Sequence, residues 1–298
     1  MASRDLFHAD ERAAQQLAGY ARTGGAIHEA LTAQHRDFFE RLAYVFAGVL
    51  DDHGWPLAAI LTGSPGFVRS PDPKTLVVRA QLPAADPAAP ALQAPRDVAL
   101  LGIDLATRRR NRANGAIIAS DAQGFAMRVQ QSFGNCPQYI QRRTSEALAR
   151  RPGPLVVARS LDETARTLIE SADTFFVASR SRPDIEEAGR VDISHRGGKA
   201  GFVAIDAQGS LVIPDYRGNR YFNTLGNLHG DPRAALLFID FDRGDSLQLQ
   251  GRVTIDWTGR SGAGDAERLW RFEPTASWRR PAAVPIAWHF VDHSPVRP

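Results

Sequence analysis

Two segments in the second half of the chain carry side chains suited to binding an anion. The first is Asp215-Tyr216-Arg217-Gly218-Asn219-Arg220, which follows an apolar run and precedes a stretch with helical spacing. A helix N-terminus offers free backbone N–H groups and a favourable dipole, and guanidinium groups grip phosphate in a fork. Arg217, Asn219 and Arg220 are therefore candidate phosphate ligands. The alternative is a solvated hairpin with two surface arginines.

The second segment is Ser194-His195-Arg196-Gly197-Gly198-Lys199. Its polar side chains, Ser194, His195, Arg196 and Lys199, would reach another anionic or electron-rich group. Paired glycines also let a ligand approach the backbone closely. We expect the two segments on neighbouring strands, with a planar ring lying across the strands and its phosphate at the helix end. A simple basic β-turn is the alternative.

A third polar cluster lies in the first half, at Asn135-Cys136-Pro137-Gln138-Tyr139-Ile140-Gln141. Proline suits the first position of a helix, with Asn135 or Cys136 as its cap, so the sequence predicts a helix running to about Arg150. Asn135, Tyr139 and Gln141 are candidate ligand contacts. Cys136 is interpreted as a buried or capping residue rather than a reactive one, because a nucleophile needs a base beside it and none is near in the sequence.

Two further groups of residues give weaker signals. His28, Glu29 and His35 lack the i, i+4 spacing of a zinc-binding helix, so no metal site is expected. The run from Arg108 to Arg112 reads as a solvated loop between two strands. Its alternative roles are salt bridges between the two halves of the chain, or closure of the binding site.

The elements that must position these groups occur twice. Gly66-Phe67-Val68 and Thr75 to Val78 match Gly201-Phe202-Val203 and Ser210 to Ile213, and Val98 to Asp104 matches Ala234 to Asp240. A repeat of this length indicates a duplicated domain rather than a solenoid. The first copy has no match to either polar segment of the second. The sequence therefore places the site mainly in the second half.

Strands at short spacing with hairpin turns and few helices indicate antiparallel barrels. We expect helices over 9–20, 35–42, 164–171 and 221–228, and a solvated loop over the proline-rich residues 83–96. Arg151-Pro152-Gly153-Pro154 is the best boundary between the halves. The predicted division is a helical arm (1–35), a first barrel ending in the Cys-Pro-x-Tyr-Ile helix (36–152) and a ligand-binding barrel (153–298).

Composition sets broad limits. The chain has 298 residues, enough for about two domains, with 43% hydrophobic and 23% charged residues. Its formal charge of +3 does not call for nucleic acid. A single cysteine excludes an internal disulfide, and neither a signal peptide nor an apolar run of about 20 residues is evident. We therefore expect a cytoplasmic protein that binds no membrane.

The segment 173–256 resembles the pyridoxamine 5′-phosphate oxidase-like FMN-binding split β-barrels. The residues that carry the resemblance are the strand pair 191–194 and 201–205, the 217–220 turn with Asn223 and Asn227, and the strand at Gly251. The Cys-Pro-x-Tyr-Ile segment is similar to a motif of one branch, the predicted flavin-nucleotide-binding proteins. In fold class, the resemblance implies a mainly β (α+β) chain of two tandem split β-barrels with peripheral helices, the first a degenerate copy.

The resemblance also implies a function. Members bind FMN between two barrels of a homodimer, so Arg217 and Arg220 would hold phosphate with Asn219 assisting, and residues 194–199 would line the flavin edge. The implied activity is that of an FMN-dependent oxidoreductase acting on an unknown small substrate, with His195 as the best candidate acid or base. The full residue set of the vitamin B6 oxidases is missing. A non-catalytic flavin-binding or electron-transfer module, and a deazaflavin or haem in place of FMN, stay open.

Overall fold

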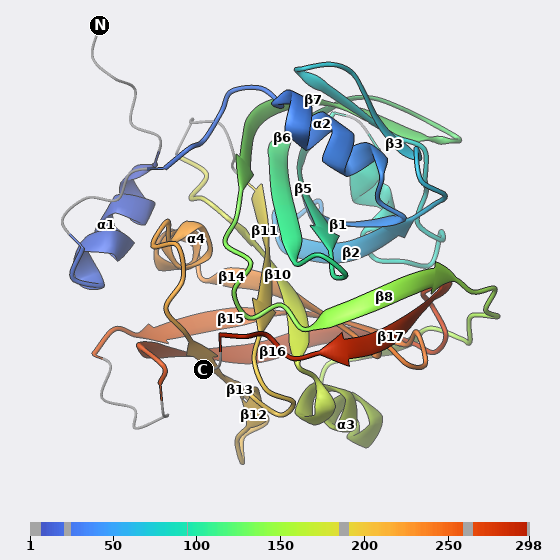
Figure 1. Cartoon of the computed structure of the whole chain (residues 1–298). Helices are drawn as coiled ribbons and strands as arrows, with labels where there is room; N and C mark the ends of the chain where they lie inside the picture. The colour runs from blue at the N-terminus through green and yellow to red at the C-terminus, as the bar shows by residue number, and fades with distance from the viewer. Residues whose placement is uncertain (1–6, 21–24, 94, 185–190, 259–264, 297–298) are drawn as a thin grey trace, which may run out of the picture.

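The protein consists mainly of antiparallel β-sheet, with α-helices at its periphery (Figure 1). The computed structural model describes residues 7–20, 25–93, 95–184, 191–258 and 265–296. Residues 1–5, on which the expectation of no signal peptide rests, lie outside this range. In the described part of the chain, no helix is both long and apolar enough to span a membrane.

The first half forms a seven-stranded sheet in the order β2-β1-β5-β6-β7-β4-β3. Its strands are β1 (Tyr44–Leu50), β2 (Pro56–Thr62), β3 (Val68–Asp72), β4 (Thr75–Val78), β5 (Asp97–Asp104), β6 (Arg109–Asp121) and β7 (Gly124–Gly134). The expected hairpin turn at residues 51–54 joins β1 to β2. All neighbouring strands run antiparallel.

The second half forms a sheet in the order β11-β10-β14-β15-β16-β13-β12, with one short extra strand beside β16. Its strands are β9 (Val156–Ala158), β10 (Thr174–Arg180), β11 (Val191–Gly197), β12 (Ala204–Ile205), β13 (Leu211–Asp215), β14 (Arg233–Ile239), β15 (Ser246–Asp256) and β16 (Arg268–Arg280). When β1 is matched with β10, and each later strand with its successor, the two orders are identical. The predicted duplication is confirmed.

The register extends this match to single residues. Phe46 pairs with Leu101, and Phe176 pairs with Leu237 at the corresponding place. Both long central hairpins carry a β-bulge at the same position, before Gly115 and before Gly251. A Cβ at Gly115 would come 1.9 Å from the carbonyl oxygen of Arg128, so the bulge requires glycine. Each residue of one barrel can therefore be assigned its counterpart in the other.

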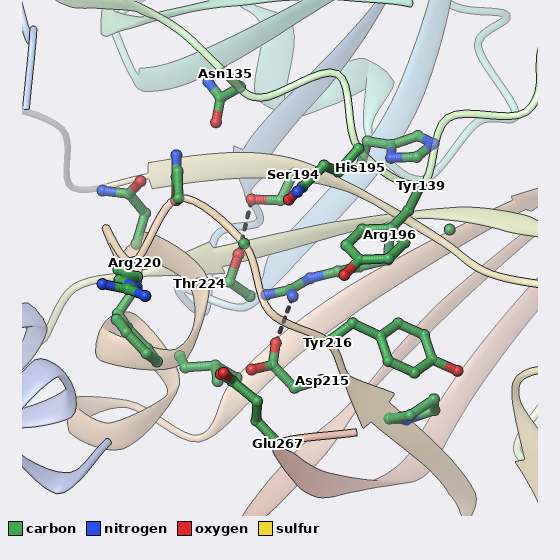
Figure 2. A pocket seen from close by; sticks show the side chains of 18 of the residues that line it. Asn135, Tyr139, Ser194, His195, Arg196, Asp215, Tyr216, Arg220, Thr224 and Glu267 are labelled. Atoms are coloured by element: carbon green, nitrogen blue, oxygen red, sulfur yellow. Dashed lines mark hydrogen bonds and ion pairs between the residues drawn. The ribbon is translucent and has the colours of Figure 1, made fainter. Parts of the chain in front are cut away.

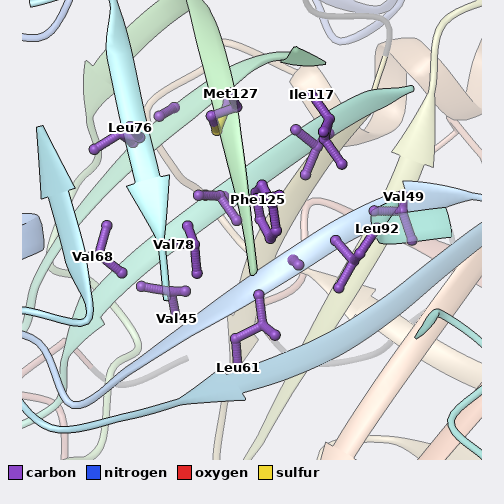
Figure 3. Close-up of a cluster of buried hydrophobic side chains, with 14 of the residues drawn as sticks. Val45, Val49, Leu61, Val68, Leu76, Val78, Leu92, Ile117, Phe125 and Met127 are labelled. Atoms are coloured by element: carbon purple, nitrogen blue, oxygen red, sulfur yellow. The ribbon is translucent and has the colours of Figure 1, made fainter. Parts of the chain in front are cut away.

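Each sheet curls around its own apolar core. In the first barrel, side chains from all seven strands enclose one cluster, and Figure 3 shows Val45, Leu61, Leu76 and Phe125 among them. Leu92 of the proline-rich segment packs into the same cluster. The expectation of a fully solvated loop there was wrong, because a short 3₁₀ helix (η1, Ala89–Leu92) buries its apolar side chains against the open edge of the barrel.

The second barrel has an apolar core of its own, but β11 contributes no side chain to it. The inward positions of β11 are instead occupied by Asp192, Ser194 and Arg196. This barrel is consequently polar at one edge, where the first is apolar.

A third apolar layer joins the two barrels. It is built from the outer faces of β1, β5, β10 and β14, because successive side chains of a strand point to opposite faces. At its centre the counterparts Phe46 and Phe176 stack with ring centroids 3.4 Å apart and planes inclined by 15°. The barrels thus pack face to face around equivalent residues.

Four α-helices lie outside the sheets in the described residues, as the sequence predicted. They are α1 (Ala9–Leu17), α2 (Ala33–Glu40), α3 (Glu163–Ser171) and α4 (Asn223–Gly230). Thr32 caps α2 by accepting from the backbone N–H of His35, and Asp162 caps α3 in the same way. In Figure 1, α1 lies beside α4, although more than 200 residues separate them.

The helix expected from Pro137 to about Arg150 is absent, so the first barrel does not end in a Cys-Pro-x-Tyr-Ile helix. Tyr139 has a φ of 63°, which a right-handed helix cannot contain. Residues beyond it form β8 (Arg142–Ala147), which pairs with β17 (Ile286–Asp292) near the C-terminus (Figure 1). Pairing with this distant strand outweighs the local helix-start signal.

Candidate functional site

The main candidate site is a pocket between the barrels, at the polar edge of the second one (Figure 2). Its cavity volume is about 110 Å³, and it opens to solvent. The second half supplies β11, the end of β13 and the start of α4. The first half supplies β6 and the segment 135–139.

The two polar segments of the second half meet here, although not as neighbouring strands. β11 and β13 lie far apart in the strand order, so that expectation was wrong. Curling of the sheet brings them together, and Arg196 donates to Asp215 across the gap at 2.6 Å (Figure 2). Arg268 holds the other oxygen of Asp215 at 2.6 Å.

β6 extends two arginines toward this edge. Arg110 and Arg112 are two residues apart on one strand, so their side chains share a face. Arg112 is 5% exposed, and its Nη1 lies 2.9 Å from both carboxylate oxygens of Asp192. Its Nη2 donates to Ser194 Oγ at 2.6 Å. The interpretation of this run as a solvated loop was wrong, and the alternative of salt bridges between the halves is what the structure contains.

Ser194 links this ion pair to α4. Its hydroxyl lies 2.7 Å from Thr224 Oγ1 and donates to Asp192 at 3.1 Å. β11 and α4 of the second barrel, together with β6 of the first barrel, are therefore fixed by one buried polar network. Such a network holds its members in a single arrangement because each would otherwise lose hydrogen bonds away from water.

Arg110 differs from the other buried arginine of β6 in its partners. Within the described part of the chain these are the carbonyl oxygen of Cys136, at 2.8 Å, and Nδ1 of His195, at 3.1 Å, with no carboxylate. Burial, together with the nearby positive charges of Arg112 and Arg196, lowers its pKa to about 9. A positive charge held under these conditions favours an anionic or electron-rich ligand beside it.

His195 is held as a neutral imidazole. Its side chain is 5% exposed, and burial, together with the positive charge of Arg110, places its pKa well below the usual value of 6.5. Because Arg110 has only N–H groups to offer, Nδ1 of His195 accepts and the proton lies on Nε2.

The N-terminus of α4 faces the pocket without a side-chain cap. Phe222 occupies the cap position with a φ of 61°, and Arg220 has a φ of 64°. Non-glycine residues seldom take this left-handed conformation. Two of them this close indicate a strained backbone of the kind found at functional sites. Residues of the first turn, Asn223 to Leu225, line the pocket together with Arg220. The arrangement is suited to an anion.

Most of the residues singled out in the sequence line this pocket, and three do not. Those that line it are Asn135, Tyr139, Ser194, His195, Arg196, Asn219 and Arg220. Arg217 and Lys199 are exposed and lie outside its lining. Gln141 is buried behind it, where its side chain donates to the carbonyl of Gly198 and accepts from the N–H of Ser294.

The glycine pair at 197–198 serves the protein's own packing. A Cβ at Gly197 would come 2.1 Å from the carbonyl oxygen of Tyr139, and one at Gly198 would meet the Phe202 ring at 2.6 Å. Gly197 lets the 135–141 segment of the first half cross over β11. It also lines the pocket, so the expectation that these glycines admit a ligand stays a prediction.

That crossing places an aromatic wall on the pocket. The rings of Tyr139 and Tyr216 lie 5.4 Å apart, inclined by 34°, and the Tyr139 hydroxyl donates to the carbonyl of Arg217 at 2.9 Å. Desolvation raises the pKa of both phenols, so both carry their protons at neutral pH.

Several lining residues were missed from the sequence. They are Asp215, Tyr216, Asn223, Thr224, Glu267 and Arg268. Arg110 and Arg112 also line the pocket, and they belong to the run whose alternative roles were salt bridges between the halves or closure of the site. Glu267 and Arg268 gave no local signal, because only the folding of β16 beside β13 brings them to the site.

Searches of protein-family models and of curated proteins gave no match. Solved structures do resemble part of the chain. An FAD-binding protein from Mesorhizobium loti is 12% identical, with 43% of this chain and 97% of that one covered and a TM-score of 0.28. A putative pyridoxamine 5′-phosphate oxidase from Corynebacterium glutamicum is 16% identical, with 43% and 94% covered and a TM-score of 0.29.

HutZ, a heme storage protein from Vibrio cholerae, is 14% identical, with 39% of this chain and 90% of that one covered and a TM-score of 0.25. The similarity to these proteins is one of fold and extends over less than half of this chain. It assigns neither a ligand nor a reaction to the pocket.

Proposed function

We propose that the pocket between the barrels binds FMN and that the protein is an FMN-dependent oxidoreductase of the pyridoxamine 5′-phosphate oxidase-like class. The observation that carries this proposal is the uncapped N-terminus of α4 beside Arg220. Free N–H groups, the helix dipole and a guanidinium together suit a terminal phosphate.

The donor set fits the two ends of such a ligand. At the phosphate end, Arg220 and the first turn of α4 would bind the phosphate, while Asn219 accepts from the N–H of Tyr221 and shapes the turn. Arg217 is exposed and does not line the pocket, so it is left out of this set. At the other end, Arg110, His195 and Asn135 offer N–H donors to the carbonyl and ring nitrogen atoms of a flavin.

When bound, the flavin would supply hydride transfer. The chain itself would bind and orient it, exclude water through the aromatic wall of Tyr139 and Tyr216, and hold positive charge beside its edge through Arg110. His195 is retained as the candidate catalytic residue in a limited role. With its low pKa it would donate a hydrogen bond from Nε2 as a neutral ring rather than deliver a proton as imidazolium.

Flavin titrations test the proposal directly. We expect the purified chain, freed of bound cofactor, to bind FMN more tightly than riboflavin or FAD. Arg220→Ala should weaken FMN binding more than tenfold, because a charged hydrogen bond contributes about 1.5–3 kcal/mol. Arg109→Ala is the matched control, since this β6 residue is exposed and lies outside the lining. Equal affinity for FMN and riboflavin would refute the phosphate assignment.

A second candidate function is a flavin-binding or electron-transfer module without turnover. The depressed pKa of His195 favours it, because no imidazolium is then at hand as a proton donor. Turnover of added NAD(P)H by the yellow protein separates the two functions. A Soret band in the visible spectrum would show that the bound cofactor is haem rather than flavin. Mass analysis of the released cofactor would identify a deazaflavin.

Two wider expectations belong to the same proposal. The sequence predicts a homodimer. One barrel-to-barrel interface is already formed within the chain, so a second chain is not needed to form it. Light scattering of the purified protein tests whether a homodimer forms. A cytoplasmic location, with the single Cys136 in its reduced form, is proposed with it.

A further inference from the structure

The N-terminal segment 7–20 packs on α4 through specific polar contacts. His8 Nε2 lies 2.9 Å from Asn227 Oδ1. A Cβ at Gly226 would come within 2.6 Å of the Cα of Glu11, so the two helices touch backbone to backbone there. This close approach fixes the position of α1 along α4.

Glu11 of α1 forms a hydrogen bond with a residue that lines the pocket. Its side chain is buried, with 6% of the residue exposed, and its Oε1 accepts from Nδ2 of Asn223 at 2.5 Å. Asn223 is the first residue of α4, and its Oδ1 lies 3.5 Å from Nη1 of Arg112. Glu11 and Arg112 therefore hold Asn223 from two sides, one from the N-terminal arm and one from the first barrel.

A buried carboxylate is costly unless it serves an interaction. Removal from water raises the pKa of Glu11, while the hydrogen bond from Asn223 and the N–H of His8 act in the opposite sense. The apolar side chains that usually dock a surface helix are few here, since the buried positions of α1 are Asp10, Glu11, Ala14 and Gln15. The contacts of α1 are thus directed at particular partners on α4.

Tyr20 grips a second residue of the pocket. Its ring lies under the guanidinium of Arg220, 4.4 Å from the Cζ atom to the ring centroid, and 5.9 Å from the ring of Phe222. Arg220 is the proposed phosphate ligand, and this cation–π contact holds its guanidinium in place.

We infer that the segment 7–20 is a positioning element of the phosphate end, in which Glu11 sets Asn223 and Tyr20 sets Arg220. Its effect is selectivity for a flavin that carries a terminal phosphate over the same flavin without one. The inference rests on the proposed function, because it assigns the phosphate to the start of α4. Neither residue touches the ligand, and both act through the side chains they hold.

Variants of Glu11 test the first contact by titration with FMN and with riboflavin. Glu11→Ala should weaken FMN binding about tenfold and leave riboflavin binding within about twofold, because only the phosphate end is disturbed. Glu11→Gln should restore FMN binding, since the amide oxygen still accepts from Asn223. Gln16→Ala is the matched control on the exposed face of the same helix.

Variants of Tyr20 test the second contact. Tyr20→Leu should weaken FMN binding about threefold through loss of the cation–π contact. Tyr20→Phe keeps the ring and loses only the long hydroxyl contact to Glu267, at 3.4 Å, so its FMN affinity should match that of the unaltered chain.

The outcomes separate this inference from the function beneath it. If the unaltered chain prefers FMN over riboflavin but the variants keep that preference, or lose both affinities alike, the positioning role is overturned and the phosphate site stands. If the unaltered chain shows no preference for FMN, both proposals are overturned. Thermal melting of each variant identifies an unfolded protein, and if Glu11→Ala unfolds, the comparison of Tyr20→Leu with Tyr20→Phe still tests the positioning role.

Discussion

The two barrels hold corresponding edges, and among the described residues only the edge of the second barrel lines the candidate site. By register, Asp192, Ser194 and Arg196 of β11 occupy the places that Leu57, Ala59 and Leu61 occupy in β2. The first set is tied to α4 and β6, whereas the second is buried in the apolar core. The same backbone therefore supports a polar pocket or a sealed edge, depending on three inward side chains.

The segment that follows the fourth strand differs in the same sense. In the second barrel it forms α4, with an open N-terminus toward the pocket. In the first barrel it is the proline-rich stretch with η1, whose Leu92 fills the core (Figure 3). An apolar plug closes one edge, and a polar helix start leaves the other open.

The largest expected effect comes from breaking the buried ion pair that distinguishes the site. Asp192→Ala leaves Arg112 charged and unpaired away from water, so the free energy of unfolding should fall by about 3–5 kcal/mol. Urea denaturation measures it.

The double variant Asp192→Leu with Arg112→Gln copies the corresponding pair of the other edge, Leu57 and Gln248. It should recover most of the stability, because replacing both members of a buried pair removes the unpaired charge. The double variant should not bind FMN as the unaltered chain does. A double variant as unstable as Asp192→Ala would show that the two edges are not interchangeable.

The next effect concerns the sealed edge. Leu61→Ala removes a side chain that is 1% exposed in the first core, and should cost about 2–5 kcal/mol of unfolding free energy. Its counterpart Arg196→Ala should cost less than about 1 kcal/mol, since Arg196 is partly exposed and Arg268 still pairs with Asp215. Chemical denaturation of both variants checks the contrast, and equal losses would contradict it.

Part of the fold and part of the candidate site could be predicted from the sequence. Repeated apolar strands and glycines at the bulges predicted the two barrels, because local patterns encode strand faces and turns. The cluster at 194–196 and Arg220 were found from their types. Arg112 was reached only as an alternative role of its run, and Arg268 and Glu11 were not found, since each reaches the site from an element distant in the chain. The helix predicted after Pro137 failed because its partner strand, β17, lies some 140 residues away.

A smaller effect should appear with pH. The folded pKa of His195 lies below that of the unfolded chain, so the unfolded state binds the proton first as pH falls below about 6.5. Stability should then fall with falling pH, by at most about 1.4 kcal/mol per pH unit from this group. His195→Asn should flatten the profile between about pH 6.5 and 5. An unchanged slope would place the titration elsewhere.

The smallest expected effect concerns which arginines of the second barrel bind the phosphate. Arg217→Ala should change FMN affinity by less than about twofold, because this exposed side chain lies outside the pocket lining. Calorimetric titration beside Arg220→Ala gives the contrast. A tenfold loss for Arg217→Ala would restore it to the phosphate site.

The stacked rings of Phe46 and Phe176 have a consequence for how such a protein can evolve. In an assembly of two identical chains, any mutation near the symmetry axis appears on both sides at once. Here the two rings belong to one polypeptide, so each codon changes one side alone. A charge introduced into one edge need not be tolerated at the other. Covalent fusion thereby freed the two edges to specialise independently.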